Sequence, residues 1–378
     1  MHRRNILKII GGGVVLAAAG AVGFSTTRRP DTALAPWGQA GQYDDPRMNA
    51  LSYAILTPNP HNRQPWIVRL DGENALTLFF DTDKQLPHTD PNDRQLTIGL
   101  GCFLELMRMA ANADGYDVAV SLFPDGTDPG GLDNRPVASV VFTAAPPLRD
   151  PLFDHVMARR SNKEPYDSTR PVPTDAIARI LQTARHGRLG GSVQDADIAF
   201  WRQLTTDALT IEFETPNTFK ESVDLFRIGK AEIEANPDGI DLGGPLFEAL
   251  SYAGVLTREA TLDPASQAYA EGLAAAHDNT QSAMGHLWLV TQDNTRADQI
   301  AIGADWLRVN LACTAEGLSF QPLSQALQEY PEMAALYQET HSRLAPGSGT
   351  VQMLARIGYG PDVDLSPRWP IAAKLGTV

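Results

Sequence analysis

The stretches GCFLELMRMAANADGY (residues 101–116) and GADWLRVNLACTAEGL (residues 303–318) match each other without gaps and lie 202 residues apart. Both begin with glycine, carry alanine at the tenth and thirteenth positions, and then have an acidic residue and a second glycine. Their apolar residues recur at the spacing of one helix face. The second glycines, Gly115 and Gly317, suit the left-handed conformation at a helix end. The sequence therefore predicts two similar amphipathic helices, one in each half of the chain.

The segments around these helices repeat as well. An apolar, strand-like run precedes each helix, at 75–80 and 286–291, and another follows each glycine, at 117–123 and 318–323. A further strand is expected at 137–144, and amphipathic helices at 45–56 and 174–184. Chance similarity between alanine-rich helices is the alternative, but the shared order of elements favours internal duplication.

We therefore expect an α+β fold with two tandem lobes that form an intramolecular pseudo-dimer. The expected lobes cover residues 37–150 and 151–378, each with an antiparallel or mixed sheet surrounded by helices. The second lobe carries an insertion at about 212–272, where Pro, Gly and Asn interrupt short helical patterns. Such a segment is either a lid over a binding site or a peripheral helical decoration.

Composition and charge exclude some classes of function. The net charge of −14 argues against a nucleic-acid partner, because phosphate binding needs clustered Lys and Arg. The two cysteines, Cys102 and Cys313, lie in apolar helical stretches and are expected to be buried free thiols, although a disulfide is conceivable outside the cytoplasm. No spacing of His, Cys, Asp and Glu predicts a metal site.

Residues 1–36 are expected to be a targeting segment. Arg3 and Arg4 precede an apolar, Ala- and Gly-rich stretch from Ile9 to Phe24, and the arginine pair resembles a bacterial twin-arginine export signal. We therefore expect an exported or periplasmic protein that uses the twin-arginine export machinery. The stretch could be cleaved or retained as an N-terminal anchor.

The segment TPNPHNRQPWIVRL (57–70) is the first motif that suggests binding. Two prolines prevent the preceding helix from continuing, and a turn rich in amide side chains follows before Trp66 opens a strand. Free amides on such a turn could bind a flat polar ligand, whereas a purely structural turn is the alternative. The candidate residues are Pro58, Asn59, Pro60, His61, Asn62 and Gln64.

Two later segments carry cations. In RRSNKEPY (159–166), Arg159, Ser161 and Lys163 alternate, so an extended chain would direct them to one side as a phosphate or ribityl clamp. A solvated charge run is the alternative. Near the C-terminus, Arg368 lies between two prolines in a stiff tail that could reach across a neighbouring unit, or that could simply be tied down by Trp369.

Taken together, these motifs resemble the nitroreductase family, whose homodimers bind FMN at the subunit interface. The family's early helix ends in a Pro- and Ser-rich turn with Asn-x-Gln-Pro-Trp, which is matched by Pro58 to Trp66. Its Arg-x-Ser-x-Lys clamp is matched by residues 159–163, and its C-terminal phosphate-contacting arginine by Arg368. The family's segment near the flavin N5 edge is matched by Pro322, Leu323, Ser324 and Gln325. Many members have Glu-Gly where this chain has Ser324-Gln325, so the side-chain contribution differs there.

The resemblance also implies one composite site. The turn lies in the first half only, whereas the clamp, the N5 segment and Arg368 lie in the second. In the family's dimer these groups come from different subunits, so this chain resembles a fused dimer with a single FMN site, functioning as a monomer. A two-lobed, single-chain Acg-like subset is most similar, through DPNDRQLTIGLG, RRSNKEPY, PDGIDL and QPLSQAL.

The resemblance implies an exported FMN-dependent oxidoreductase that performs two-electron chemistry on a small organic molecule, with another small molecule as electron donor or acceptor. The alternative is a protein that binds or sequesters FMN without turnover. A third hypothesis is a degenerate fold that binds no flavin and serves in interactions. No catalytic triad or nucleophile motif is found in the sequence, so the flavin itself would carry the chemistry.

Overall fold

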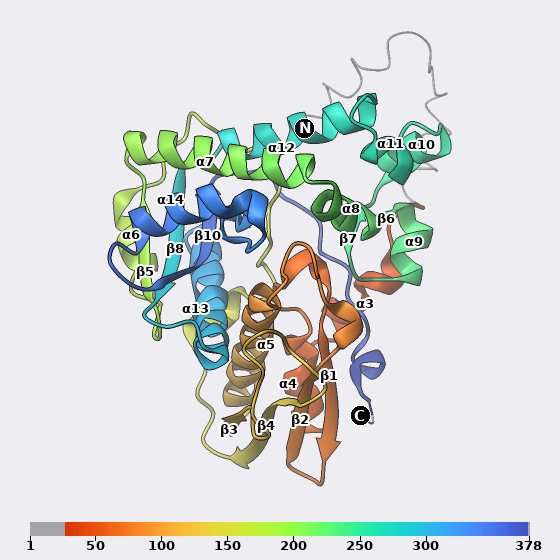
Figure 1. Cartoon of the computed structure of the whole chain (residues 1–378). Helices are drawn as coiled ribbons and strands as arrows, with labels where there is room; N and C mark the ends of the chain where they lie inside the picture. Colours follow the sequence, from red (N-terminus) through yellow and green to blue (C-terminus); the bar gives the residue numbers. More distant parts are fainter. Residues whose placement is uncertain (1–26, 377–378) are drawn as a thin grey trace.

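Two four-stranded antiparallel sheets with the same strand connectivity form the two lobes of the computed structural model, which describes residues 27–376 (Figure 1). The first sheet has the order β1-β2-β4-β3. Its strands are β1 (Trp66–Asp71), β2 (Ala75–Phe80), β3 (Tyr116–Leu122) and β4 (Pro136–Ala144). The second sheet has the order β5-β8-β10-β9. Its strands are β5 (Arg188–Ser192), β8 (Gly285–Thr291), β9 (Ser319–Pro322) and β10 (Thr350–Gly358).

A long helix lies between the second and third strands of each lobe. These helices are α5 (Arg94–Ala113) and α13 (Arg296–Ala315), each of 20 residues. Both are followed by a glycine with positive φ, 85° at Gly115 and 68° at Gly317, as their position after each helix predicts. The two helices pack against each other at the centre of the molecule, so the pseudo-dimer interface is part of the main hydrophobic core.

Shorter helices precede each sheet. Helix α4 (Pro46–Ala54) begins at the N-cap Asp45, whose side chain accepts a hydrogen bond from Arg47 N. Its counterpart in the second lobe is α6 (Thr174–Ile180). Helix α3 (Asp31–Gln39) comes before both. The matching order of helices and strands confirms the expected α+β class with two lobes.

The chain between β5 and β8 forms the insertion, which is largely helical. It contains α7 (Asp195–Glu214), α8 (Pro216–Asp224), α9 (Gly229–Ala235), α10 (Pro245–Tyr252), α11 (Arg258–Leu262) and α12 (Gln267–Gln281), with the parallel pair β6 (Phe226–Ile228) and β7 (Ile240–Leu242). Helices α7 and α12 lie along the second lobe, whereas β6, β7 and α9 lie next to α3 and the first lobe (Figure 1). The insertion therefore contacts both lobes.

After β10 the chain leaves the second lobe and runs along the first (Figure 1). Leu375 forms an isolated parallel bridge with Val68, and Gly376 N donates to Val68 O at 3.0 Å. Helix α14 (Ala334–Leu344) packs near β10, and the short helix η6 (Ile371–Lys374) lies in the tail. The tail thus links the last residues of the second lobe to the first sheet.

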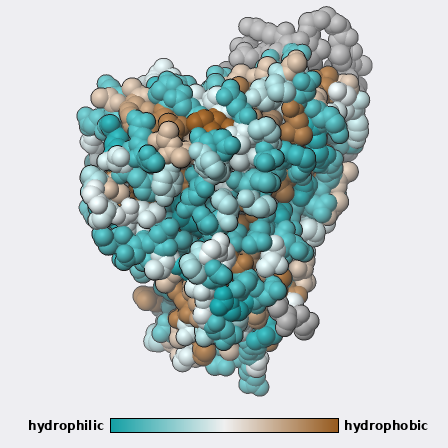
Figure 2. Space-filling model, in the orientation of Figure 1, coloured by the Kyte–Doolittle hydropathy of each residue, from teal (hydrophilic) through white to brown (hydrophobic). Residues whose placement is uncertain are grey.

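Both cysteines are buried free thiols, as expected, and Cys102 Sγ donates to Gly303 O at 3.1 Å. Within residues 27–376, no helix has the length and apolar character needed to cross a membrane. The segment with Arg3 and Arg4 lies outside the described residues. The face in Figure 2 is mainly hydrophilic, with hydrophobic residues in small separate patches, in keeping with the acidic composition.

Candidate functional site

The bend after α4 has an unusual backbone. His61, Asn62 and Gln64 have φ values of 48°, 50° and 51°, in the left-handed region that non-glycine residues rarely adopt. Three such residues within four positions persist only if the surrounding structure holds them. Asn59 Oδ1 accepts a hydrogen bond from Gln64 N at 2.7 Å, and Lys374 Nζ donates to Gln64 O at 2.7 Å.

The side-chain amides of this bend bind other parts of the protein. Gln64 is buried, with Nε2 donating to Pro237 O at 2.6 Å and Oε1 accepting from Trp369 N at 2.9 Å. Asn62 Nδ2 donates to Pro367 O at 3.1 Å. The expectation that these amides are free for a ligand is therefore wrong for Asn62 and Gln64, because the tail and the insertion occupy them. Pro58 is buried, whereas Asn59, Pro60 and His61 are half-buried.

Two buried guanidinium groups meet at the end of α4. Arg159 Nη2 and Arg368 Nη2 both donate to Leu56 O, at 2.9 and 3.1 Å. Arg368 also donates to Thr57 O at 3.1 Å and to Asn62 Oδ1 at 2.7 Å. The acceptors are thus carbonyl and amide oxygens rather than carboxylates.

Burial lowers the pKa of Arg159 to about 10 and that of Arg368 to about 9, and the Arg159 charge contributes to the second shift. Arg368 Nε has no hydrogen-bond partner among the described residues. The structure therefore places the predicted cations Arg159 and Arg368 directly against the predicted bend, although these residues are 209 positions apart in the sequence. Two adjacent buried cations of this kind favour a nearby anion.

Lys163 and Asp241 belong to the same cluster. Lys163 is exposed and Ser161 is half-buried, so the alternating residues extend from the interior at Arg159 toward the surface. The Lys163 charge lowers the pKa of His61, for which burial is the larger cause, to about 4. Asp241, on β7, is exposed, and the charges of Lys163 and Arg368 favour its ionised form.

The predicted N5 segment lies beside the cation clamp. Asn162 N donates to Phe320 O at 2.8 Å, which joins the clamp strand to β9. Pro322 ends β9, Leu323 N donates to Leu354 O at 2.8 Å, and Ser324 is buried. Gln325 begins the short helix η4 (Gln325–Leu327) and is half-buried. The clamp segment and the 322–325 segment thus lie at one edge of the second sheet, whereas Arg368 comes from the tail.

A buried carboxyl group, absent from the predicted site, lies next to Gln325. Glu212, on the last turn of α7, is 6% exposed, and its Oε2 has no hydrogen-bond partner among the described residues. Burial raises its pKa to about 7, although the neighbouring polar side chains of Gln328, Gln325 and Ser222 work against that shift. No local pattern marks Glu212, because its neighbours come from distant segments.

The insertion connects this carboxyl group with the bend. His61 Nε2 and Ser222 Oγ are 3.2 Å apart, and Ser222 is one of the polar neighbours of Glu212. Asp238 bonds Lys84 Nζ at 2.6 Å and Arg227 Nη2 at 2.8 Å, while Gly239 N donates to Asn62 O at 3.3 Å. The insertion is therefore fastened to the first lobe beside the candidate site.

No family model matches the chain. Among proteins of Mycobacterium tuberculosis, it is 26% identical over 315 residues to "Putative NAD(P)H nitroreductase Rv3131", covering 82% of this chain and 84% of that protein. It is 25% identical over 342 residues to "Putative NAD(P)H nitroreductase acg", covering 85% and 93%. "Uncharacterized protein Rv3127" is 24% identical over 348 residues, with coverage of 86% and 92%.

Solved structures give shorter alignments. An FMN-dependent nitroreductase, NfnB from Mycobacterium smegmatis in complex with NADPH, aligns with a TM-score of 0.37 and 14% identity, covering 59% of this chain and 96% of that one. A nitroreductase with bound FMN from Bacteroides fragilis aligns with a TM-score of 0.35 and 13% identity, covering 61% and 99%.

Proposed function

Since the chain belongs to the nitroreductase family, we propose that it binds one FMN between its lobes and exchanges two electrons with a small organic molecule. FMN would supply the redox chemistry, and the protein would supply binding, orientation and electrostatics. The site would combine the bend of the first lobe with the cations and the 322–325 segment of the second.

The observation that carries this proposal is the meeting of Arg159 and Arg368 at Leu56 O. The hydrogen-bond acceptors of these two desolvated guanidinium groups are uncharged oxygens, and Asp241 is a nearby carboxylate that acts on Arg368. A phosphate group would add negative charge with geometry that suits guanidinium donors. The unpaired Nε of Arg368 is a free donor for such an anion. These residues therefore fit the phosphate end of FMN.

The remaining residues have separate tasks. Lys163 would add charge at the outer end of the clamp, and Ser161 would bind a ribityl or phosphate oxygen. Backbone N–H groups near Ser324 and Gln325 would stabilise negative charge at the flavin edge. Asn62 and Gln64, which bind the tail and the insertion, would hold the bend in shape rather than contact the flavin through their amides.

A second candidate function is the holding of FMN without turnover. The bonds from Pro237, Asp238 and Gly239 to the first lobe favour it, because they fasten the insertion beside the site. An insertion that stays in place would keep electron donors and acceptors from the flavin. The two candidates differ in whether bound flavin exchanges electrons with added molecules.

Purified protein tests both candidates. We expect a yellow preparation that releases one FMN per chain on denaturation, and Arg159→Ala should lower FMN affinity by about 10- to 100-fold, the value of a hydrogen bond to a charged group. Arg149→Ala, at an exposed ion pair with Asp154, is the matched control. Unchanged FMN occupancy in the Arg159 variant contradicts the site.

Electron exchange then separates the two functions. Photoreduced flavin that is rapidly reoxidised by a quinone or a nitroaromatic compound supports an oxidoreductase. Flavin that stays reduced in the presence of these acceptors supports the holding of FMN without turnover.

We further propose that the protein is exported. The support is the arginine pair Arg3-Arg4 before an apolar stretch. Fractionation of cells that produce the full chain, compared with an Arg3→Lys, Arg4→Lys variant, tests this proposal. Accumulation of both proteins in the cytoplasm contradicts it.

A further inference from the structure

We propose that Glu212 is the proton-exchanging group of the flavin site, and that it reaches solvent through a pocket behind it lined by Tyr330 and Thr218. This inference rests on the proposed function, since it assigns Glu212 to the flavin edge near Gln325. It goes beyond that function by naming the source of the proton that two-electron reduction of an organic molecule consumes.

Polar side chains and one like charge surround the Glu212 carboxyl group, and one of its oxygens has no hydrogen-bond partner among the described residues. Its polar neighbours are Ser222 on α8 and Gln325 and Gln328 in the 325–328 segment. Glu221 is its charged neighbour on α8, and Tyr330 is the titratable group on the other side. Oε2 has no partner among the described residues, and neither does Gln328 Oε1. A carboxyl group kept near its neutral form is suited to give up or accept a proton.

The polar contacts continue to the bend. Ser222 Oγ lies 3.2 Å from His61 Nε2, and Gln325 adjoins Ser324 in the segment assigned to the flavin edge. Glu212 therefore lies where the insertion, the first-lobe bend and the second-lobe edge converge. Ser222, which contacts His61, and Gln325 are both its neighbours, so the candidate site lies on two sides of this carboxyl group.

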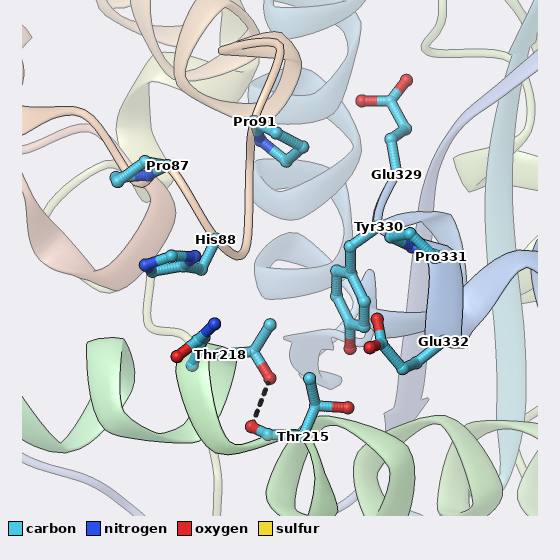
Figure 3. Close-up of a pocket in the computed structure, with 10 residues that line it drawn as sticks. Pro87, His88, Pro91, Thr215, Thr218, Glu329, Tyr330, Pro331 and Glu332 are labelled. Atoms are coloured by element: carbon cyan, nitrogen blue, oxygen red, sulfur yellow. Dashed lines mark hydrogen bonds between the residues drawn. The ribbon is translucent and has the colours of Figure 1, made fainter.

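A pocket of about 340 Å³ lies at the junction of α7 and α8, next to the last turn of α7 that carries Glu212 (Figure 3). Tyr330 and Thr218 are among the residues that line it, and Thr218 Oγ1 donates to Glu212 O at 2.9 Å. The Glu212 charge raises the pKa of Tyr330, for which burial is the larger cause. Tyr330 Oη has no hydrogen-bond partner among the described residues, and in Figure 3 it points toward the α7–α8 junction.

The outer wall of this pocket is open. Pro87 and His88 from the first lobe and Glu332 from the second are exposed. Tyr330 lines this pocket, and its buried hydroxyl group would pass a proton from water in the pocket toward Glu212. The proposed route leads from solvent through the pocket and Tyr330 to Glu212, and then to the edge at Gln325.

The balance of the step is simple for a quinone acceptor. The quinone takes a hydride equivalent, with both electrons, from two-electron-reduced FMN and one proton from the Glu212 carboxylic acid, and becomes a hydroquinone. Glu212 is left as a carboxylate. A proton from water, delivered through the pocket, restores its neutral form.

The test uses the FMN-loaded full chain and the absorption spectrum of its oxidised flavin between pH 5 and 9. In the wild type we expect a one-proton spectral transition near pH 7, because the charge of Glu212 changes beside the flavin. Glu212→Gln should abolish the transition, whereas Glu214→Gln, exposed on the same helix, should retain it. At pH 6, Glu212→Gln should also slow menadione reduction about 100-fold, a common contribution of a general acid.

Tyr330→Phe tests the route separately. Its spectral transition should persist, while reoxidation of reduced flavin by menadione slows at least several-fold. A wild-type spectrum that does not change with pH overturns the inference even if the Glu212 variant fails to fold. Binding of FMN without that transition refutes this inference alone, whereas a protein that holds no FMN overturns the proposed function as well.

Discussion

Gly101 and Gly303 face each other where α5 and α13 cross, and the contact is reciprocal. A Cβ atom on Gly101 would lie 2.1 Å from Ile300 O and 2.9 Å from Gly303 Cα. A Cβ atom on Gly303 would lie 2.1 Å from Ile98 O and 2.6 Å from Gly101 Cα. Gly101 thus contacts Ile300, and Gly303 contacts Ile98, the residue at the equivalent position 202 residues earlier. The same reciprocal pattern is found at the interface of a twofold-symmetric dimer. The glycines that begin the two repeats allow the helices to approach backbone to backbone.

Gly101→Ala should therefore destabilise the protein. The new methyl group meets backbone atoms that cannot rotate away, so the helices must separate, at a cost of about 1–3 kcal/mol or more. Urea unfolding measures this as a lower midpoint. Gly38→Ala is the control, since Gly38 lies in α3 with nothing within 4 Å of an added Cβ atom, and there alanine should be neutral or slightly stabilising. Equal stability of the two variants contradicts the close crossing.

The sequence predicted the regular parts of the fold well. The apolar run at 75–80 is β2, the run at 286–291 lies within β8, and both long helices are present. It missed β5, whose Gly190 and Gly191 have low strand propensity. The reason for glycine is tertiary, because a Cβ atom on Gly190 would lie 2.2 Å from Trp288 Nε1.

The central strand β10 was missed for a related reason. Arg356 interrupts its apolar pattern and yet is fully buried, because its guanidinium group donates to Ser282 Oγ, Glu164 O and other acceptors far away in the sequence. The candidate site follows the same rule. Motifs identified Arg159 and Arg368, whereas Glu212 has no motif, because only the packing of α7 against residues 325–328 places it at the site.

Gln64→Ala should loosen the attachment of the C-terminal tail. The substitution leaves Trp369 N and Pro237 O without their partner, and each unpaired buried group costs about 1–3 kcal/mol. We expect lower stability to urea and faster proteolysis after residue 359. Gln203→Ala, at an exposed position on α7, is the matched control. Resistance of the tail equal to that of the wild type contradicts the role assigned to Gln64.

His286→Leu should increase stability in acid. His286 is fully buried on β8, neither ring nitrogen has a partner among the described residues, and burial lowers its pKa to about 3 from the usual 6.5. The unfolded chain binds the proton more readily, so wild-type stability is lost as pH falls from about 6.5 toward 3. The unfolding free energy of the variant minus that of the wild type should be about 2 kcal/mol higher at pH 5 than at pH 8. His186→Leu, at an exposed position, should show no such gain in urea unfolding.

Glu212→Gln should change the pH dependence of stability in the opposite sense. The folded-state pKa of Glu212 is raised to about 7 from the usual 4.5, so the folded protein binds the proton more tightly than the unfolded chain. The contribution of this group to stability is fully present below about pH 4.5 and is lost as pH rises through about 7.

Glutamine has no such titration, so the variant should become more stable relative to the wild type between pH 4.5 and 8, by roughly 3 kcal/mol. Urea unfolding of FMN-free protein at several pH values measures this difference independently of redox chemistry. The stability of Glu214→Gln should change with pH in the same way as that of the wild type, since the Glu214 carboxyl group is exposed. A Glu212 variant whose stability also changes in the same way as that of the wild type would mean that the Glu212 carboxyl group is already ionised in the folded protein, and it could not then supply the proton that the flavin site requires.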